Sequence, residues 1–87
     1  MIENSMQNSY LVITKKKTVL EILENDETSM FYGNPFEITV QDINEIIEFF
    51  ENTEEYEKCA ELVKAKKSLE FDEFLHALGV NNGVTMH

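Results

Sequence analysis

Residues 39–67 carry two consecutive apolar stripes with helical spacing, and this pattern constrains the fold more than any other part of the chain. The first stripe occupies positions i, i+3, i+4 and i+7 and consists of Ile43, Ile46, Ile47 and Phe50. The second has the same spacing and consists of Tyr56, Cys59, Ala60 and Val63. Because so few residues separate the stripes, the sequence predicts two antiparallel helices joined by a tight break at Asn52-Thr53.

Signals at the ends of these helices agree with the pattern. Thr39 is suited to cap the first helix, and Asp42 three residues later completes a capping box. Thr53 is predicted to cap the second helix. Glutamates follow Thr53 and lysines occur at 64–67, which matches the polarity of a helix dipole.

The part of the chain before this hairpin predicts a small β element. Residues 1–8 are polar and aperiodic, so we expect a flexible tail. Residues 10–14 and 29–32 are rich in β-branched and aromatic side chains and predict two strands. Residues 18–25 are ambiguous: Thr18 and Glu21 favour a short helix, and a strand paired with residues 10–14 is the alternative.

The part after the hairpin predicts a third helix that starts at Ser68. One face of this helix holds Phe71, Phe74, Leu75 and Leu78, and Gly79 is placed to end it. Residues 80–87 are expected to be a second flexible tail. The fold class predicted for residues 1–87 is therefore a single, mostly helical α+β domain, in which a helical hairpin and a third helix pack beside a two-stranded β element.

Composition narrows the class of protein. A chain of 87 residues with 43% hydrophobic residues can bury one modest core. No apolar run approaches the 18 residues of a membrane span, and the N-terminus lacks the basic start and long apolar segment of a secretory signal. A single cysteine excludes an internal disulfide, so a cytoplasmic location is expected.

The distribution of charge is the most unusual feature of the composition. The formal net charge is −10, and residues 18–57 hold twelve carboxylates without a lysine or arginine. One interpretation is a surface that only keeps the protein in solution. The other is a surface that meets a basic partner through an attraction that salt screens.

Candidate catalytic and metal-binding residues are sparse. Cys59 lies on the apolar stripe, where a thiol acts as a small hydrophobe. His76 could share a metal ion with Asp72 four residues earlier, but no second histidine or cysteine lies near it. The acidic turn at 25–27 lacks the glycine and closing glutamate of a calcium loop. We therefore expect no enzyme activity, no cofactor, no metal and no direct nucleic-acid binding.

Two resemblances add to this reading. The run Tyr56-Glu57-Lys58-Cys59-Ala60-Glu61-Leu62 is similar to the second helix of the UVR helical hairpin, a protein-contact module of excision-repair proteins, but Val63 stands where that motif normally has an arginine. More broadly, residues 34–39 with residues 54–60 resemble small acidic accessory proteins of large tailed phages. This second resemblance implies a viral protein that acts in the host cytoplasm.

The leading functional hypothesis is a non-catalytic, acidic module for protein–protein interaction. It would dock on a basic surface of a nucleic-acid-handling or defence protein and inhibit or redirect it. Carboxylates three or four residues apart on a helix lie roughly 5–6 Å apart, close to the spacing of phosphates, so DNA mimicry is one version of the hypothesis. The alternative is a small structural subunit of a virion or other assembly, with self-association.

The candidate partner-binding residues are the hairpin carboxylates and two apolar residues that lie off the main stripes. They are Asp42, Glu45, Glu48, Phe49, Glu51, Glu54, Glu55, Glu57 and Leu62. Phe49 and Leu62 are either covered by the lead-in segment or exposed to a partner.

Overall fold

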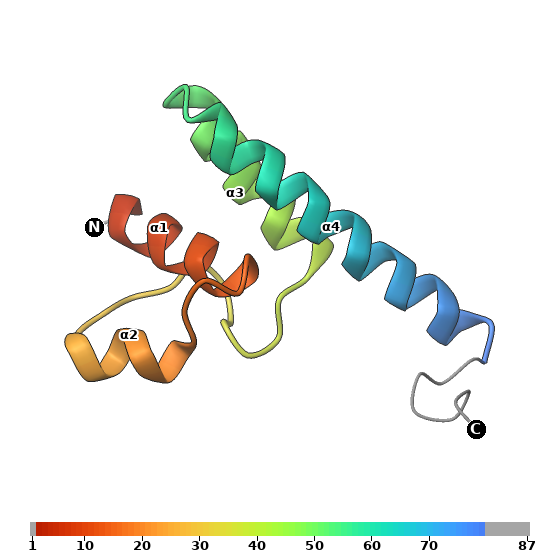
Figure 1. The fold of residues 1–87 in the computed structure, drawn as a ribbon, viewed down its shortest axis with the longest axis horizontal. Coiled ribbons are helices and arrows are strands. Elements are labelled where there is room, and N and C mark those ends of the chain that lie inside the picture. The colour runs from red at the N-terminus through yellow and green to blue at the C-terminus, as the bar shows by residue number, and fades with distance from the viewer. Residues whose placement is uncertain (1, 80–87) are drawn as a thin grey trace.

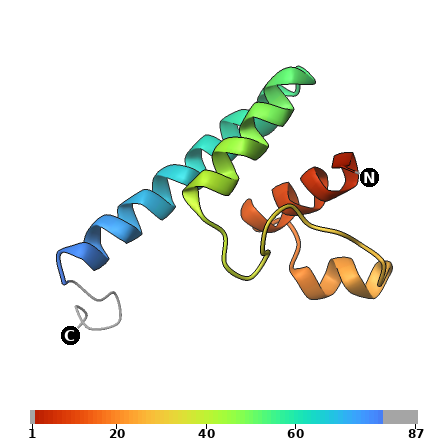
Figure 2. The same ribbon diagram turned by 180° about the vertical axis from the view of Figure 1, so that it is seen from behind.

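Over residues 2–79, which the computed structural model describes, the chain forms four helices and no strand. They are α1 (Ile2–Ile13), α2 (Val19–Asn25), α3 (Val40–Asn52) and α4 (Tyr56–Ala77). Helices α3 and α4 lie side by side in opposite directions, and α1 packs across them (Figures 1 and 2). The predicted α+β class is therefore wrong, and the fold is all-helical over this range.

The difference from the predicted fold lies in the N-terminal part of the chain, where two strands were expected. Residues 2–8, expected as a tail, and residues 10–13, expected as a strand, together form α1. Met6, Ser9 and Tyr10 are buried and Ile13 packs against the core, so these four residues line one helical face at i, i+3, i+4 and i+7. Burial of this face against α3 and α4 outweighs the local β propensity of residues 10–14.

The second expected strand, residues 29–32, is an irregular segment in the structure. Its backbone is satisfied by side chains of α1. Asn8 Nδ2 donates to the Met30 carbonyl at 2.9 Å, and the Tyr32 amide donates to Ser9 Oγ at 2.7 Å. Ser9 Oγ in turn donates to the Tyr32 carbonyl at 3.2 Å, and this exchange fixes the segment without a neighbouring strand.

The helical hairpin was predicted correctly, but the face by which α4 packs was not. Of the stripe predicted for this helix only Cys59 is buried, Tyr56 and Ala60 are exposed, and Leu62 fills the core instead. Thr39 and Asp42 form the expected capping box, with the Asp42 amide donating to Thr39 Oγ1 at 3.0 Å. Thr18 and Glu21 form a second capping box, so residues 19–25 are helical as favoured. The turn falls later than predicted, because Thr53 is the C-cap of α3 and Glu55 is the N-cap of α4.

The third helix is not a separate element. Helix α4 runs through Ser68 without interruption, because the residues on either side of it are good helix formers and none breaks the helix. Gly79 has a φ of 83° and its amide donates to the His76 carbonyl, as expected for the residue that ends a helix. The expected tail at 80–87 lies outside the described residues.

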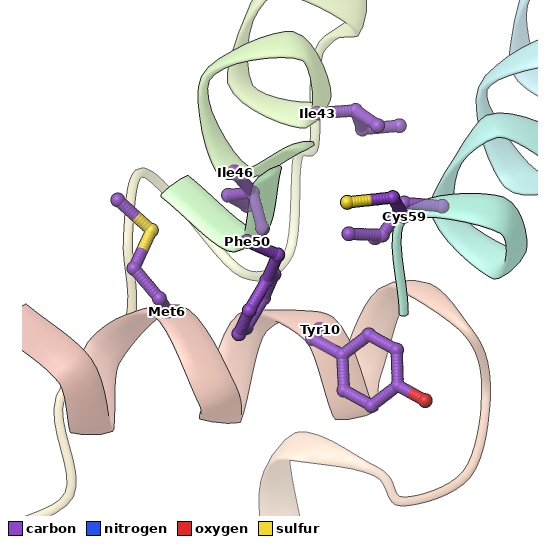
Figure 3. Packing of buried hydrophobic residues seen from close by; sticks show 7 residues of the cluster. Met6, Tyr10, Ile43, Ile46, Phe50 and Cys59 are labelled. Atoms are coloured by element: carbon purple, nitrogen blue, oxygen red, sulfur yellow. The ribbon is translucent and has the colours of Figure 1, made fainter. Parts of the chain in front are cut away.

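The core lies where α1 crosses the hairpin (Figure 3). Ile43, Ile46, Phe50 and Leu62 are fully buried, and Met6, Tyr10 and Cys59 complete the cluster. The rings of Tyr10 and Phe50 meet edge to face with their centroids 5.8 Å apart. Among residues 2–79, no helix has both the length and the apolar character required to cross a bilayer.

Candidate interaction surface

The turn of the hairpin presents a group of exposed carboxylates that we call the acidic tip. Its members are Glu48, Glu51, Glu54 and Glu57, which come from the end of α3, the turn and the first turn of α4. Within residues 2–79, their side chains make no hydrogen bond or ion pair. These four groups are therefore available to a partner.

The other three predicted carboxylates are engaged inside the protein. Asp42 accepts from the Thr39 amide at 3.2 Å as part of the capping box. Glu45 accepts from the Tyr32 hydroxyl and from Gln41 Nε2, and these hydrogen bonds lower the pKa of its carboxyl.

Glu55 is the third engaged carboxylate. It accepts hydrogen bonds from Lys58 Nζ and from Thr53 Oγ1. Both bonds lower the pKa of its carboxyl, and the bond from Lys58 has the larger effect. The predicted acidic surface is thus smaller than the sequence indicates, and it is concentrated at the tip.

Two features of the acidic tip oppose local stability. Glu54 has a φ of 60°, a left-handed conformation that suits glycine or asparagine and is unfavourable for glutamate. Glu51 lies in the last turn of α3, at the negative end of the helix dipole, and that turn holds no basic residue. Residues that break local preferences in this way are typical of positions held for function.

The two apolar candidates are covered. Leu62 is 0% exposed and belongs to the core, so its prediction as a possible exposed contact is wrong. Phe49 is half-buried, and its ring packs edge to face on Phe50 at 5.1 Å. Helix α1, which is part of the lead-in segment, packs on the same core, so of the two alternatives the covered one holds for Leu62 and in part for Phe49.

A polar cluster joins α1 to α4 on the side of the core. The Tyr10 hydroxyl donates to Glu61, which also forms an ion pair with Lys16 at 3.1 Å. Burial and the hydrogen bond to Glu61 raise the pKa of Tyr10 to about 12, and the same bond lowers the pKa of Glu61. Lys58 Nζ lies over the Phe50 ring, 5.2 Å from its centroid, and forms a cation–π contact beside this cluster.

An open groove of about 560 Å³ lies next to this cluster. Its lining includes the apolar residues Ile13, Ile38, Ile43 and Leu69 and charges of both signs, among them Lys64 and Asp72.

The remaining chemical candidates have structural or solvent-facing positions. Cys59 is 8% exposed, its thiol donates to the Ile47 carbonyl at 3.6 Å, and burial raises its pKa, as do Glu51 and Glu55. His76 and Asp72 are both exposed. Within residues 2–79, no cluster of three or more histidine, cysteine, aspartate or glutamate residues could hold a metal ion.

The sequence reasoning missed one exposed apolar surface. Phe71, Phe74 and Leu78 are 58%, 58% and 62% exposed, although their spacing predicts a packed helix face. These residues do share one face of the helix, as predicted, but this face is exposed and points away from the core. The signal that could have shown this is the continuity of α4, because Leu62 and Leu69 face inward and fix the rotation of the whole helix.

No family model, curated protein or solved structure matches this chain. The candidate surface therefore rests on the contacts, exposure and charge described above.

Proposed function

We propose that the chain is a non-catalytic protein-binding module that uses its acidic tip to dock on a basic surface of another protein. The observation that carries the proposal is the tip itself, where four exposed carboxylates form no ion pair with any residue of the described range 2–79 and one of them, Glu54, has an unfavourable backbone conformation. Such a surface attracts a basic partner over a range set by the ionic strength.

The class of partner we propose is a nucleic-acid-handling or defence protein, which the module would inhibit or redirect. Proteins that bind nucleic acid present lysine and arginine to phosphates, and a row of carboxylates can occupy the same groups. Glu48 and Glu51 are three residues apart on α3, so their spacing of roughly 5–6 Å supports mimicry of a phosphate strand over a short distance. The resemblance to accessory proteins of tailed phages fits such a target inside a host cell.

The test is capture of host proteins on the immobilised chain at low and high salt, with identification by mass spectrometry. We expect one or a few nucleic-acid enzymes that are released as salt rises. A variant with glutamine at all four tip positions should lose them. The matched control replaces Glu3, Glu24, Glu27 and Glu37 by glutamine, which removes the same charge from exposed sites elsewhere.

The two variants distinguish binding through the acidic tip from an effect of net charge alone. Equal loss of binding in the two variants would show that only total charge matters, and this contradicts a site at the tip. Added duplex DNA should release a captured enzyme if the tip occupies its nucleic-acid site. Retention in the presence of excess DNA would leave docking intact and rule out mimicry.

One observation favours a second candidate, a subunit of a larger assembly. The outer face of α4 exposes two phenylalanines and a leucine, and exposed apolar faces commonly mark protein interfaces. Leu62 is fully buried, so it is not available for such a contact.

A further inference from the structure

Helix α4 extends well beyond the helix that covers it. It has 22 residues and α3 has 13, which corresponds to lengths of roughly 33 and 20 Å. The C-terminal half of α4 therefore projects from the body of the protein, as Figures 1 and 2 both show.

A mostly apolar stripe runs along the outer side of α4, turned away from the fully buried Leu62. Its members recur every three or four residues, as on one helix face: Tyr56, Ala60, Val63, Lys67, Phe71, Phe74 and Leu78. Lys67 is the one charged member, and Val63 is half-buried. Tyr56 is 63% exposed at one end and Leu78 is 62% exposed at the other. We call this stripe the outer face.

The charges beside the outer face change sign along the helix. Lys64 and Lys67 precede its midpoint, and Glu70 follows it. Lys67 and Glu70 are symmetric about the point between Ser68 and Leu69, as are Val63 and Phe74. When two such helices run in opposite directions about that point, Lys67 faces Glu70 of the second copy and Val63 faces Phe74.

We propose that the outer face of α4 is the contact between two copies of this chain, paired antiparallel about residues 68–69. Charge complementarity selects this partner and this direction. A parallel pair would set lysine against lysine and glutamate against glutamate, and like charges in contact disfavour association.

The acidic tips support the same direction. From the centre of the pair to Tyr56 is about 12 residues, so the two tips lie roughly 40 Å apart in the antiparallel dimer. This distance is several times the screening length of about 8–10 Å at physiological salt. A parallel dimer would bring the tips together, and the strong negative charge of the chain would oppose it.

The size of the face defines the strength of the contact. Each phenylalanine or leucine of the projecting half exposes roughly 100 Å², and six such side chains with the adjoining stems of the lysines give about 1,000 Å² in the dimer. This area is at the lower end for specific interfaces, so we expect a reversible dimer with a Kd of roughly 10–100 μM.

The first test is sedimentation equilibrium of the full chain from about 5 to 500 μM, a range that brackets this Kd. We expect the mass to rise from 10.1 kDa toward twice that value. Phe74→Ala should weaken association at least tenfold, because each dimer loses two rings from its interface. Phe36→Ala, which removes a 77% exposed ring outside α4, should leave the Kd unchanged.

The second test concerns the charges. Lys67→Glu and Glu70→Lys should each weaken the dimer, and the double variant should restore it, because the exchange recreates the pair across the interface. Circular dichroism of every variant confirms that the helices are retained. Failure of the double variant to recover would overturn the proposed register.

The third test fixes the direction by disulfide formation in a Cys59→Ala background. Ala60 and Leu78 both lie on the outer face, nine residues on either side of Leu69, and so lie opposite each other in the antiparallel pair. A mixture of Ala60→Cys and Leu78→Cys chains should crosslink, and neither chain should crosslink with itself.

Two results would overturn the proposal: a chain that stays monomeric at 500 μM, or self-crosslinking of Leu78→Cys, which indicates a parallel pair. Neither result bears on docking through the acidic tip, so the two proposals fail independently.

Discussion

Replacement of Glu54 by glycine should make the protein more stable while it weakens partner binding. Glu54 has a φ of 60° in the turn between α3 and α4, and its amide donates to the Glu51 carbonyl at 3.1 Å. The side chain is exposed and makes no hydrogen bond or ion pair within residues 2–79, so its removal breaks no contact there. Glycine adopts this conformation without the steric conflict of a Cβ atom.

The magnitude follows from two opposing contributions. The left-handed conformation costs a non-glycine residue about 1–2 kcal/mol, and glycine gives back about 0.5–1 kcal/mol through the greater freedom of the unfolded chain. The net gain is about 0.5–1 kcal/mol. For a domain of this size, that gain raises the midpoint of thermal unfolding by roughly 2–8 °C.

The assay is thermal unfolding followed by circular dichroism at neutral pH, with urea unfolding as an independent measure. Glu57→Gly is the matched control, because the same substitution three residues later falls inside α4 and should lower stability. Glu54→Gln removes the charge and keeps the Cβ atom, so it should change the midpoint much less than Glu54→Gly. This pair separates the backbone contribution from charge repulsion.

The reasoning is refuted if Glu54→Gly and Glu57→Gly lower the midpoint equally, because the turn would then gain nothing from glycine. It is also refuted if Glu54→Gln gives the full stabilisation, since charge repulsion would then be the whole cause. A more stable Glu54→Gly chain that binds its partner less well would show that the residue is retained for binding at the expense of stability.

Three further outcomes are expected. Leu62→Ala should lower the free energy of unfolding by about 2–5 kcal/mol in urea titrations, whereas Phe36→Ala should change it by less than about 0.5 kcal/mol, because only Leu62 is buried. The pKa of Tyr10 is about 12 in the folded protein against an ordinary value of 10.0, so the fold favours the protonated hydroxyl. The stability that this provides is complete below pH 10 and is lost as the pH rises to 12. Tyr10→Phe should therefore remove this part of the decline in the urea midpoint at alkaline pH. Cys59 should react with a thiol reagent at the rate of unfolding in the native protein and at once in denaturant; rapid native labelling would contradict its burial.

The hairpin was predictable because its signals are local and agree with one another. The apolar spacing of residues 43–50, the Thr39–Asp42 capping box and the short turn all specify the same arrangement. The spacing of residues 56–63 predicted a helix but not its buried face, because Leu62 and not Tyr56 or Ala60 enters the core. The helix at 19–25 was favoured for the same reason, since Thr18 and Glu21 form a reciprocal cap.

Helix α1 could not be assigned from local preference. Residues 10–14 favour a strand on their own, and residues 2–8 show few apolar side chains. The helical state is stabilised by contacts with residues 40 or more positions away, such as Tyr10 with Phe50 and Glu61. The burial of Ser9, a small polar residue that binds the Tyr32 backbone, also has no signature in the hydrophobic pattern.

The negative charge of the candidate surface could be predicted from the sequence, but the number of carboxylates free to bind a partner could not. Seven carboxylates of the hairpin were selected from the sequence as candidates, and only the structure shows that Asp42, Glu45 and Glu55 are held by internal hydrogen bonds. The direction of the outer face of α4 likewise depends on the rotation of a continuous helix, which the expected break at Ser68 concealed.

The two proposed surfaces have a joint consequence, because they occupy different parts of the same helix. The acidic tip lies at the N-terminal end of α4, and the proposed centre of pairing lies about 12 residues further along. An antiparallel pair therefore presents two tips that point in opposite directions, roughly 40 Å apart. A partner with one basic surface would bind each tip independently, whereas a partner with two basic surfaces at this separation would be held by both, and its apparent affinity would rise with dimer formation. Binding that strengthens over the concentration range of dimerisation, and loses that dependence in Phe74→Ala, would connect the two proposals.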